Sequence, residues 1–180
     1  MGMKVPRRRY LLKMNFRIPV ALVALVLLGS CQTIQQPLRP GMTRTAVAAS
    51  YSDLDLPNGD TKEVALNGSW GTFWESDQEV GLKVGYDNLE VPGSSTDAWT
   101  LALYGRYYLS TTDALLPWVE LDLGWTDSDR DSNVSYAGAI GLTQFVSQGG
   151  ALEAGIEYQN AFGDVDTSGI RLQIGYAVFF

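Results

Sequence analysis

The sequence of 180 residues contains no histidine, which removes the side chain that most often acts as a general base or binds a metal. It contains one cysteine, Cys31, so the chain can form no internal disulfide and no thiolate metal cage. Basic residues are few, because 13 Lys and Arg stand against 20 Asp and Glu, for a formal net charge of −7. Nucleic acid requires clustered Lys and Arg and is therefore not an expected partner. These absences predict a protein without catalytic activity, cofactor or metal.

Long apolar runs are also missing, apart from IPVALVALVLL at residues 18–28. Its 11 residues are too few for a transmembrane helix, which needs about 20. The first 30 residues carry six Lys and Arg and no acid, so residues 31–180 hold seven bases and 20 acids, a net charge of −13. A basic segment followed by a short apolar run is typical of a secretory signal peptide. We interpret residues 1–30 as such a peptide, with Met1, Met3 or Met14 as its start.

The apolar run ends in LGSC at residues 28–31, which resembles the lipobox of bacterial lipoproteins. An ordinary signal peptidase fits less well, because cleavage before Cys31 would place Leu28 at the −3 position, where a small residue is preferred. The resemblance implies that the lipoprotein-processing machinery lipidates Cys31, and Gln32 favours the outer membrane. The alternative is a chance cysteine after an ordinary signal peptide. Residues 31–42 then form the lipidated N-terminus and a linker rich in glutamine and proline.

Apolar and polar residues alternate with period two from residue 43 to the end of the chain, in segments of about ten residues separated by turn residues. This pattern predicts β-strands rather than helices. The eight expected strands are 43–53, 62–75, 79–88, 98–109, 116–126, 133–144, 150–160 and 167–180. The first is the least regular. The pattern predicts an all-β fold, an eight-stranded antiparallel up-and-down transmembrane β-barrel over residues 43–180.

The aromatic residues indicate which face of the strands is turned outward. If the apolar faces point out, aromatic side chains gather near the two ends of the strands and leave mainly aliphatic residues between them. The residues of these two girdles are Trp74, Tyr86, Trp99, Tyr107, Trp125, Tyr136, Tyr158 and Phe180. Membrane interfaces select such belts, whereas a soluble core does not sort its aromatic residues by height. The pattern therefore predicts an apolar face toward lipid and a polar lumen.

The connections between strands give a second indication. One set is short, at 76–78, 110–115 and 145–149, and the other is longer and acidic, at 54–61, 89–97, 127–132 and 161–166. Outer-membrane barrels have short periplasmic turns and longer outer loops. An even number of strands puts both ends of the barrel on the side of the short turns. A lipid on Cys31 would face the periplasm as well, so the two predictions agree.

Four stretches carry a resemblance to a known family: GSWGTFWESDQEVGLKVGYDN, WTLALYGRYYLSTTDALLPWVELDLGWTDSD, GAIGLTQFVSQGGALEAGIEYQ and RLQIGYAVFF. With them, residues 43–180 resemble the small outer-membrane β-barrel domain family, the OmpA-like and porin-like eight-stranded barrels. The resemblance implies a location in the cell outer membrane and insertion by the barrel-assembly machinery. The closing residues Tyr176, Val178 and Phe180 resemble the C-terminal signal that this machinery reads. A lipobox departs from the plain signal peptide that is usual in the family.

Charged residues on the inward faces would fill the lumen of so narrow a barrel. They are Glu63, Lys83, Arg106, Glu120, Asp122, Glu153, Glu157 and Arg171, accompanied by Tyr104, Tyr108 and Trp118. One interpretation is a cation-selective channel or a paired-carboxylate active site. The other, which we favour, is a network of ion pairs and hydrogen bonds that plugs the lumen. The enzymes among the barrels that this chain resembles, lipid A modifiers and omptin-like proteases, rely on histidine, which is missing here.

The segment DSDRDSN at residues 127–133 spaces three carboxylates two residues apart, as in an EF-hand loop. Ser132 stands where that loop needs glycine, and Gly138 stands where it needs a bidentate glutamate. We therefore predict no specific calcium site. The carboxylates instead belong to a hydrated loop, where divalent cations can bridge them to lipopolysaccharide.

Three functional hypotheses follow. The favoured one is a monomeric integral outer-membrane protein with a structural, surface-interaction or envelope-integrity role, whose partners are outer-membrane lipids and lipopolysaccharide. The second is a narrow channel for ions or small solutes. The third is a soluble barrel, tethered by its lipid, that binds an apolar ligand. In that barrel the faces are inverted, and Trp70, Leu82 and Leu103 contact the ligand.

Overall fold

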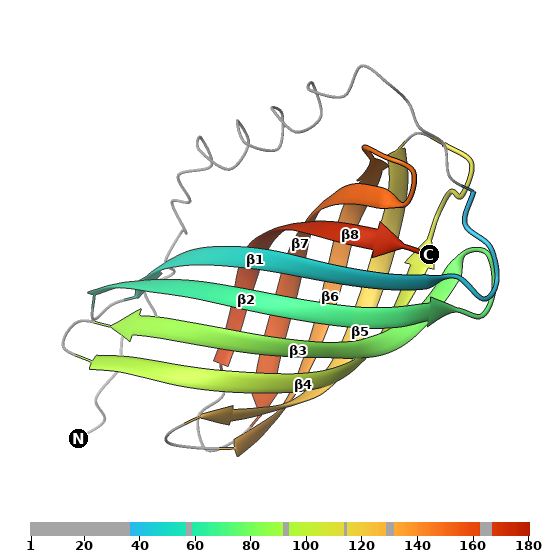
Figure 1. The fold of residues 1–180 in the computed structure, drawn as a ribbon. Coiled ribbons are helices and arrows are strands. Elements are labelled where there is room, and N and C mark those ends of the chain that lie inside the picture. Colours follow the sequence, from blue (N-terminus) through green and yellow to red (C-terminus); the bar gives the residue numbers. More distant parts are fainter. Residues whose placement is uncertain (1–36, 57–58, 92–93, 114, 129–131, 163–166) are drawn as a thin grey trace, which may run out of the picture.

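The computed structural model describes residues 37–56, 59–91, 94–113, 115–128, 132–162 and 167–180. The expected signal peptide 1–30 and Cys31 lie outside the described residues. Within the described ranges, no helix has the length and apolar character needed to cross a membrane. Eight strands close into a barrel in sequence order (Figure 1). They are β1 (Thr43–Leu56), β2 (Gly59–Phe73), β3 (Gln78–Val91), β4 (Ser94–Tyr108), β5 (Leu115–Ser128), β6 (Ser132–Phe145), β7 (Gly150–Phe162) and β8 (Thr167–Phe179).

All eight expected strands are confirmed, and so is the antiparallel up-and-down barrel. Each strand pairs antiparallel with the next, and β1 also pairs with β8 from Arg44↔Phe179 to Tyr51↔Leu172, which closes the sheet. Successive side chains of a strand point to opposite faces of the sheet. In a closed barrel, one set therefore faces the lumen and the other faces outward.

Two of the four connections expected to be long are mostly strand. β3 and β4 stay paired through most of the expected loop 89–97, and β1 and β2 do so through most of 54–61. The other two, 127–132 and 161–166, are each shortened by strand residues at their ends. The predicted contrast between short and long connections is therefore wrong.

The backbone explains this difference, because a hairpin pairs its N–H and C=O groups whatever side chains it carries. Polar side chains even add cross-strand bonds in this region. Asp97 Oδ1 accepts hydrogen bonds from Asn88 Nδ2 at 2.7 Å and from the Tyr86 hydroxyl at 3.0 Å. A stretch of acids, asparagine and serine thus continues the β-ladder, although its composition is typical of a loop.

The apolar faces of the strands point away from the barrel, as predicted. Trp70 is 52% exposed, Leu82 45% and Leu103 63%. The intervening positions are buried, as in β5, where Trp118 and Glu120 are each 2% exposed. The third hypothesis required these apolar residues to line the lumen, so its inverted arrangement of faces is wrong.

Apolar side chains fill one mouth of the barrel, at the end that holds the start of β1 and the C-terminus (Figure 1). We call these buried residues the mouth cluster; its large members are Leu38, Met42, Phe73, Tyr108, Leu116, Trp118, Phe145 and Phe179. Residues 37–42, which the sequence assigned to the linker, supply two of them, and we call this stretch the mouth segment. Gly41, at φ +83°, turns it so that the Gly41 N–H donates to the Phe73 carbonyl at 2.8 Å.

Candidate functional site in the barrel lumen

The lumen holds all eight charged residues that the sequence placed on the inward faces. β2 contributes Glu63, β3 Lys83, β4 Arg106, β5 Glu120 and Asp122, β7 Glu153 and Glu157, and β8 Arg171. Each of these side chains is at most 13% exposed and takes part in an ion pair. Burial of a charge is costly unless the charge is paired, so the pairing is a condition for filling the lumen with these residues.

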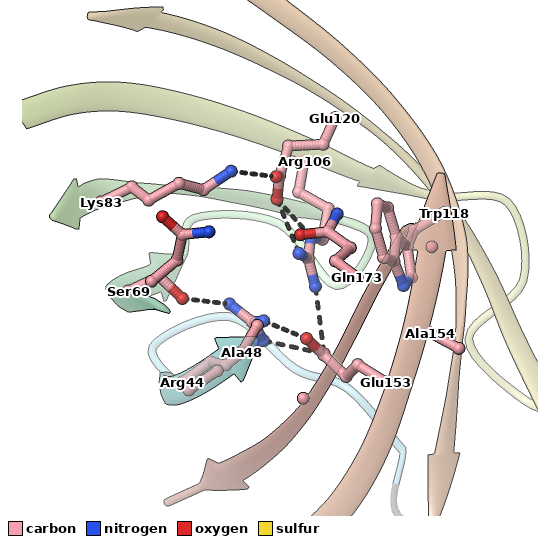
Figure 2. Close-up of a pocket in the computed structure, with 14 residues that line it drawn as sticks. Arg44, Ala48, Ser69, Lys83, Arg106, Trp118, Glu120, Glu153, Ala154 and Gln173 are labelled. Atoms are coloured by element: carbon pink, nitrogen blue, oxygen red, sulfur yellow. Dashed lines mark hydrogen bonds and ion pairs between the residues drawn. The ribbon is translucent and has the colours of Figure 1, made fainter. Parts of the chain in front are cut away.

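Glu153 joins two arginines in the part of the lumen next to the mouth cluster (Figure 2). Its Oε1 accepts hydrogen bonds from Arg44 Nε at 2.9 Å, from Arg106 Nη1 at 3.0 Å and from the Thr143 hydroxyl at 3.0 Å. Arg44 also binds Oε2, so that its contact is bidentate. The carboxylate thereby holds two buried guanidinium groups that would otherwise repel each other.

Glu79 is the second carboxylate of this region and is 1% exposed. Its Oε1 lies 3.3 Å from Arg44 Nη1, and its Oε2 accepts a hydrogen bond from the Tyr108 hydroxyl at 3.2 Å. The Tyr104 hydroxyl donates to Oε1 as well. Every oxygen of Glu79 therefore has a partner, which allows a carboxylate to be buried this deeply.

Lys83 is the hub at the middle of the network. Its Nζ lies 2.7 Å from Glu120 Oε1, 2.6 Å from Asp122 Oδ2 and 3.7 Å from Glu157 Oε2. These three carboxylates present oxygens within 4.8 Å of one another, a geometry that suits a metal ion. The ammonium group of Lys83 lies among them instead and supplies the positive charge from the chain itself. We therefore interpret this cluster as an ion-pair hub.

Arg106 continues the network from this hub toward the mouth cluster. Its Nε donates to Glu120 Oε2 at 2.7 Å, and its guanidinium carbon lies 3.9 Å from the centre of the Trp118 ring. This distance is typical of a cation–π contact. A Cβ at Gly141 would lie 2.2 Å from the same ring, so the glycine on β6 makes room for the indole inside the barrel.

Arg171 organises the part of the lumen nearest the hairpins of β1–β2 and β3–β4. It forms an ion pair with Glu63, and its Nη1 lies 3.4 Å from Asp87 Oδ1 and 3.9 Å from Glu157 Oε1. The Ser52 hydroxyl donates to Glu63 Oε2 at 3.0 Å. The side chains of Glu63 and Arg171 are 12% and 13% exposed, so this end of the network is closer to solvent than the Arg44 end.

Three members of the network, Arg44, Glu79 and Asp87, were not among the residues predicted for the lumen. Arg44 and Glu79 lie at the start of their strands, where few preceding residues are available to show the alternation. The sequence does carry a signal for these residues. Glu79 and Asp87 lie an even number of positions from Lys83 on β3 and therefore share its inward face. Arg44 lies an odd number of positions from the outward-facing Val47, which is 55% exposed, and therefore points inward.

The ion pairs of the described residues join more acids than bases. The cations are Arg44, Lys83, Arg106 and Arg171, and the carboxylates are Glu63, Glu79, Asp87, Glu120, Asp122, Glu153 and Glu157. With every group ionised, the lumen carries an excess of negative charge. Each cation contacts two or three carboxylates, which spreads this excess through the network.

Two small cavities of about 20 Å³ and 30 Å³ lie within the network. The first, drawn in Figure 2, is bordered by Arg44, Arg106 and Glu120, and the second by Asp87 and Arg171. Lys83 borders both. Each has room for about two water molecules, since a water needs at least about 10–15 Å³ of such volume. Cavities of this size leave no room for an organic solute.

The aromatic residues assigned to the girdles lie on the outside, near the strand ends. The most exposed of them are Trp74, Trp99, Trp125 and Phe180, at 60–69%, followed by Tyr107, Tyr136 and Tyr158 at 41–47%. Tyr86 stands opposite Trp99 on the neighbouring strand, with ring centroids 4.9 Å apart. Tyr176, Val178 and Phe180, proposed as the assembly signal, also point outward, at 46%, 43% and 69% exposure.

The segment considered for calcium falls largely outside the described residues, which omit 129–131. Of the described part, Asp127 Oδ1 accepts a hydrogen bond from the Ser132 hydroxyl at 2.6 Å. This bond joins the end of β5 to the start of β6. It gives Asp127 a structural partner within the chain.

Known proteins are similar to this chain in fold but do not match it in sequence. No family model and no curated protein matches the sequence. The crystal structure of Neisserial surface protein A is similar, with a TM-score of 0.56 and 20% identity over 77% of this chain and 96% of that chain. The N-terminal barrel domain of OprF and the outer membrane protein OprG, both from Pseudomonas aeruginosa, each give a TM-score of 0.57. Their identities are 16% and 13%, over 81% and 82% of this chain and 100% and 99% of theirs.

At these identities the similarity concerns the fold alone. It shows that the closed eight-stranded antiparallel barrel of this chain is an architecture found in outer-membrane proteins.

Proposed function

We propose that this protein is a monomeric integral outer-membrane barrel with a closed lumen and a non-enzymatic role in envelope structure or in contacts at the cell surface. One observation carries the proposal: a network of buried ion pairs fills the inside of a barrel whose outside is apolar. An apolar exterior banded by aromatic residues suits lipid, and water is a poor solvent for it. Outer-membrane lipids and lipopolysaccharide are therefore the proposed partners.

The absence of an enzymatic role is supported by how the buried carboxylates are used. Glu153 and Glu120 are each held between two cations, and Glu79 between a guanidinium and two tyrosine hydroxyls. A general base needs a free acceptor that can reach a substrate, and the small cavities leave no room for one. The sequence also lacks histidine, the usual base on such a scaffold.

The proposed orientation places the mouth cluster toward the periplasm. Both the mouth segment and the C-terminus lie at that end of the barrel (Figure 1). Cys31, the proposed lipid attachment site, precedes the first described residue, Pro37, by six residues, which span at most about 20 Å. The lipid can therefore enter the membrane leaflet at this end of the barrel. Insertion would require the barrel-assembly machinery, and lipidation the lipoprotein-processing machinery.

Extraction and gel migration test the location. We expect the protein to require detergent for solubility and to migrate faster on gels before boiling than after it, because an intact barrel resists dodecyl sulfate. A protein that is soluble and monomeric without detergent would overturn the proposal. In intact cells, a thiol introduced by Asp129→Cys should react with an impermeant reagent, and a thiol reactive only after cell disruption would reverse the orientation.

The excess of carboxylates favours a second candidate, a narrow cation-selective channel. Planar-bilayer recordings distinguish the two functions. We expect no discrete conductance, because the cavities are water-sized and the ion pairs of Lys83 lie between them. Regular single-channel steps with cation selectivity would establish the channel instead.

A further inference from the structure

We propose that the mouth segment, residues 37–42, is a stopper that closes the lumen to water at the end where β1 begins and β8 ends. The proposal deepens the closed-lumen function and rests on it. It assigns the closure of this end to a short piece of chain outside the β-ladder rather than to the ion pairs of the lumen. The stretch that the sequence identifies as linker thereby acquires a separate task.

The side chains of the mouth segment divide into two sets. Leu38 and Met42 are each 4% exposed and belong to the mouth cluster, whereas Arg39 and Pro40 are exposed. Buried apolar residues beside exposed ones are the pattern of a lid over an opening. Burial of a leucine or methionine side chain stabilises by about 1.5–3 kcal/mol, so two such residues hold the segment in place.

Aromatic rings from the strand ends form the seat of this lid. Phe73 lies with its ring centroid 5.5 Å from that of Tyr108 and 6.2 Å from that of Phe179, and Phe145 lies 5.0 Å from Phe179. These rings come from β2, β4, β6 and β8, so they line the mouth around its circumference. The mouth segment lies against this ring of side chains from the N-terminal side of β1.

Few hydrogen bonds attach the mouth segment to the barrel. Besides the Gly41–Phe73 bond, the Phe73 N–H donates to the Met42 carbonyl at 2.9 Å, and the Thr72 hydroxyl donates to the same carbonyl at 3.2 Å. These bonds involve only the end of β2. The remaining ladder of the barrel does not depend on them, so the segment can be altered while the barrel stays closed.

The region beneath the stopper is the part of the network that tolerates water least. Arg44 follows Met42 by two residues and is 2% exposed, and Glu79 is 1% exposed. The smaller cavity, which Arg44 and Ala46 border, lies on the lumen side of this pair. The ion pairs of Lys83 follow on its far side. Removal of the stopper should therefore admit water and small cations as far as Lys83 and no farther.

A thiol placed in the smaller cavity tests the proposal in the full mature chain, in detergent or lipid. The reporter is Ala46→Cys, which is 4% exposed, and the probe is a small cationic methanethiosulfonate. The parent chain, whose only cysteine is Cys31, gives the background rate. The stopper is disrupted by the pair Leu38→Asp and Met42→Asp. A second pair, Leu38→Ala and Met42→Ala, removes the packing without adding charge, and heat-shifted gel migration verifies that each barrel is folded.

We expect both pairs to raise the rate of modification at residue 46 by about tenfold or more, because the rate follows the population of the open mouth. The matched control Arg39→Ser changes an exposed residue of the same segment and should leave the rate unchanged. A second reporter, Ala137→Cys, borders the larger cavity beyond Lys83 and should also be unaffected. Equal rates at residue 46 with intact and disrupted mouth segments would overturn the stopper.

Conductance separates failure of the stopper from failure of the proposed function. If the parent protein conducts ions in discrete steps, the closed-lumen function is wrong whatever the labelling shows. If it does not conduct and residue 46 reacts equally in every variant, the function stands and the stopper is wrong, since the ion pairs alone then exclude water.

Discussion

The two ends of the barrel are closed by different interactions. At the mouth end, apolar side chains cover Arg44 and Glu79, which are almost completely buried. The opposite end holds the β1–β2 and β3–β4 hairpins, and we call it the hairpin end. There the pairing of β1 with β8 stops at Tyr51↔Leu172, and the partly exposed ion pair of Arg171 with Glu63 lies in the lumen. Charges are more deeply buried where packing excludes water. The comparison indicates that removing a partner should cost more toward the mouth cluster than toward the hairpins.

The largest effect is expected at the hub between the two ends. Lys83→Met removes the cation that Glu120, Asp122 and Glu157 share, and leaves Asp122 without an ion-pair partner among the described residues, whereas Glu120 keeps Arg106 and Glu157 keeps Arg171. Loss of one partner of a buried ion pair costs about 3–5 kcal/mol. Urea unfolding from lipid vesicles measures this loss. Added Ca²⁺ should restore part of the stability in this variant, because the three carboxylates have the spacing of a cation site. Lys83→Arg is the control, and a variant as stable as the parent would contradict the hub.

The next largest effect tests the packing at the mouth end. Leu116→Ala removes a side chain that is 1% exposed within the mouth cluster and should lower the free energy of unfolding by about 2–5 kcal/mol. The matched control is Leu121→Ala on the same strand, where the leucine is 74% exposed. Its truncation opens no cavity in the protein and should cost less. Equal losses in the two variants would show that the mouth cluster contributes no special packing.

A smaller effect is expected from the ion pair at the hairpin end. Glu63→Gln removes one partner of Arg171, which keeps Asp87 and Glu157, so we expect a loss of about 1–3 kcal/mol. The same change at Glu153 should cost more, because it separates Arg44 and Arg106 from their shared carboxylate. The ratio of the two losses measures how strongly the surroundings of each ion pair matter. A greater loss for Glu63→Gln would reverse the comparison of the two ends.

The smallest effect concerns the polar hairpin itself. Asp97→Ala removes hydrogen bonds from Tyr86 and Asn88 on the exposed face and should change the stability by no more than about 0.5 kcal/mol. Amide hydrogen exchange should nevertheless become faster in the β3–β4 hairpin. A large loss of global stability would show that this hairpin supports the barrel, rather than only extending it.

Much of the barrel follows from the sequence, because strand alternation has a period of two that composition reveals directly. Leu101, Leu103 and Tyr107 on β4 alternate with Tyr104 and Arg106, and this order separates the two faces of the strand. The aromatic belts then indicate which face points outward. The charged residues of the lumen are predicted by the same rule. Their partners are not, because contacts such as Arg44 with Glu153 join residues 109 positions apart and depend on the shear of the closed barrel.

The sequence is least informative where the backbone forms strand pairs without the side chains that usually indicate a strand. The hairpin extensions beyond Asn88 carry acids and serines that suggest a loop, yet their pairing depends on backbone groups. The mouth segment has no period, since it is neither strand nor helix, and only its two buried residues distinguish it from a flexible linker. Such a short apolar contact becomes recognisable once the seat that receives it is known.

The pairing of β1 with β8 also has a consequence for the order of folding. The first strand can form its second set of hydrogen bonds only with the last one, so the sheet cannot close until the whole chain is available. Contacts between residues so distant in sequence are slow to form, because a long stretch of chain must first be brought together. We therefore expect the ion pairs that Arg44 makes with β7 to be among the last native contacts formed, after neighbouring hairpins have assembled.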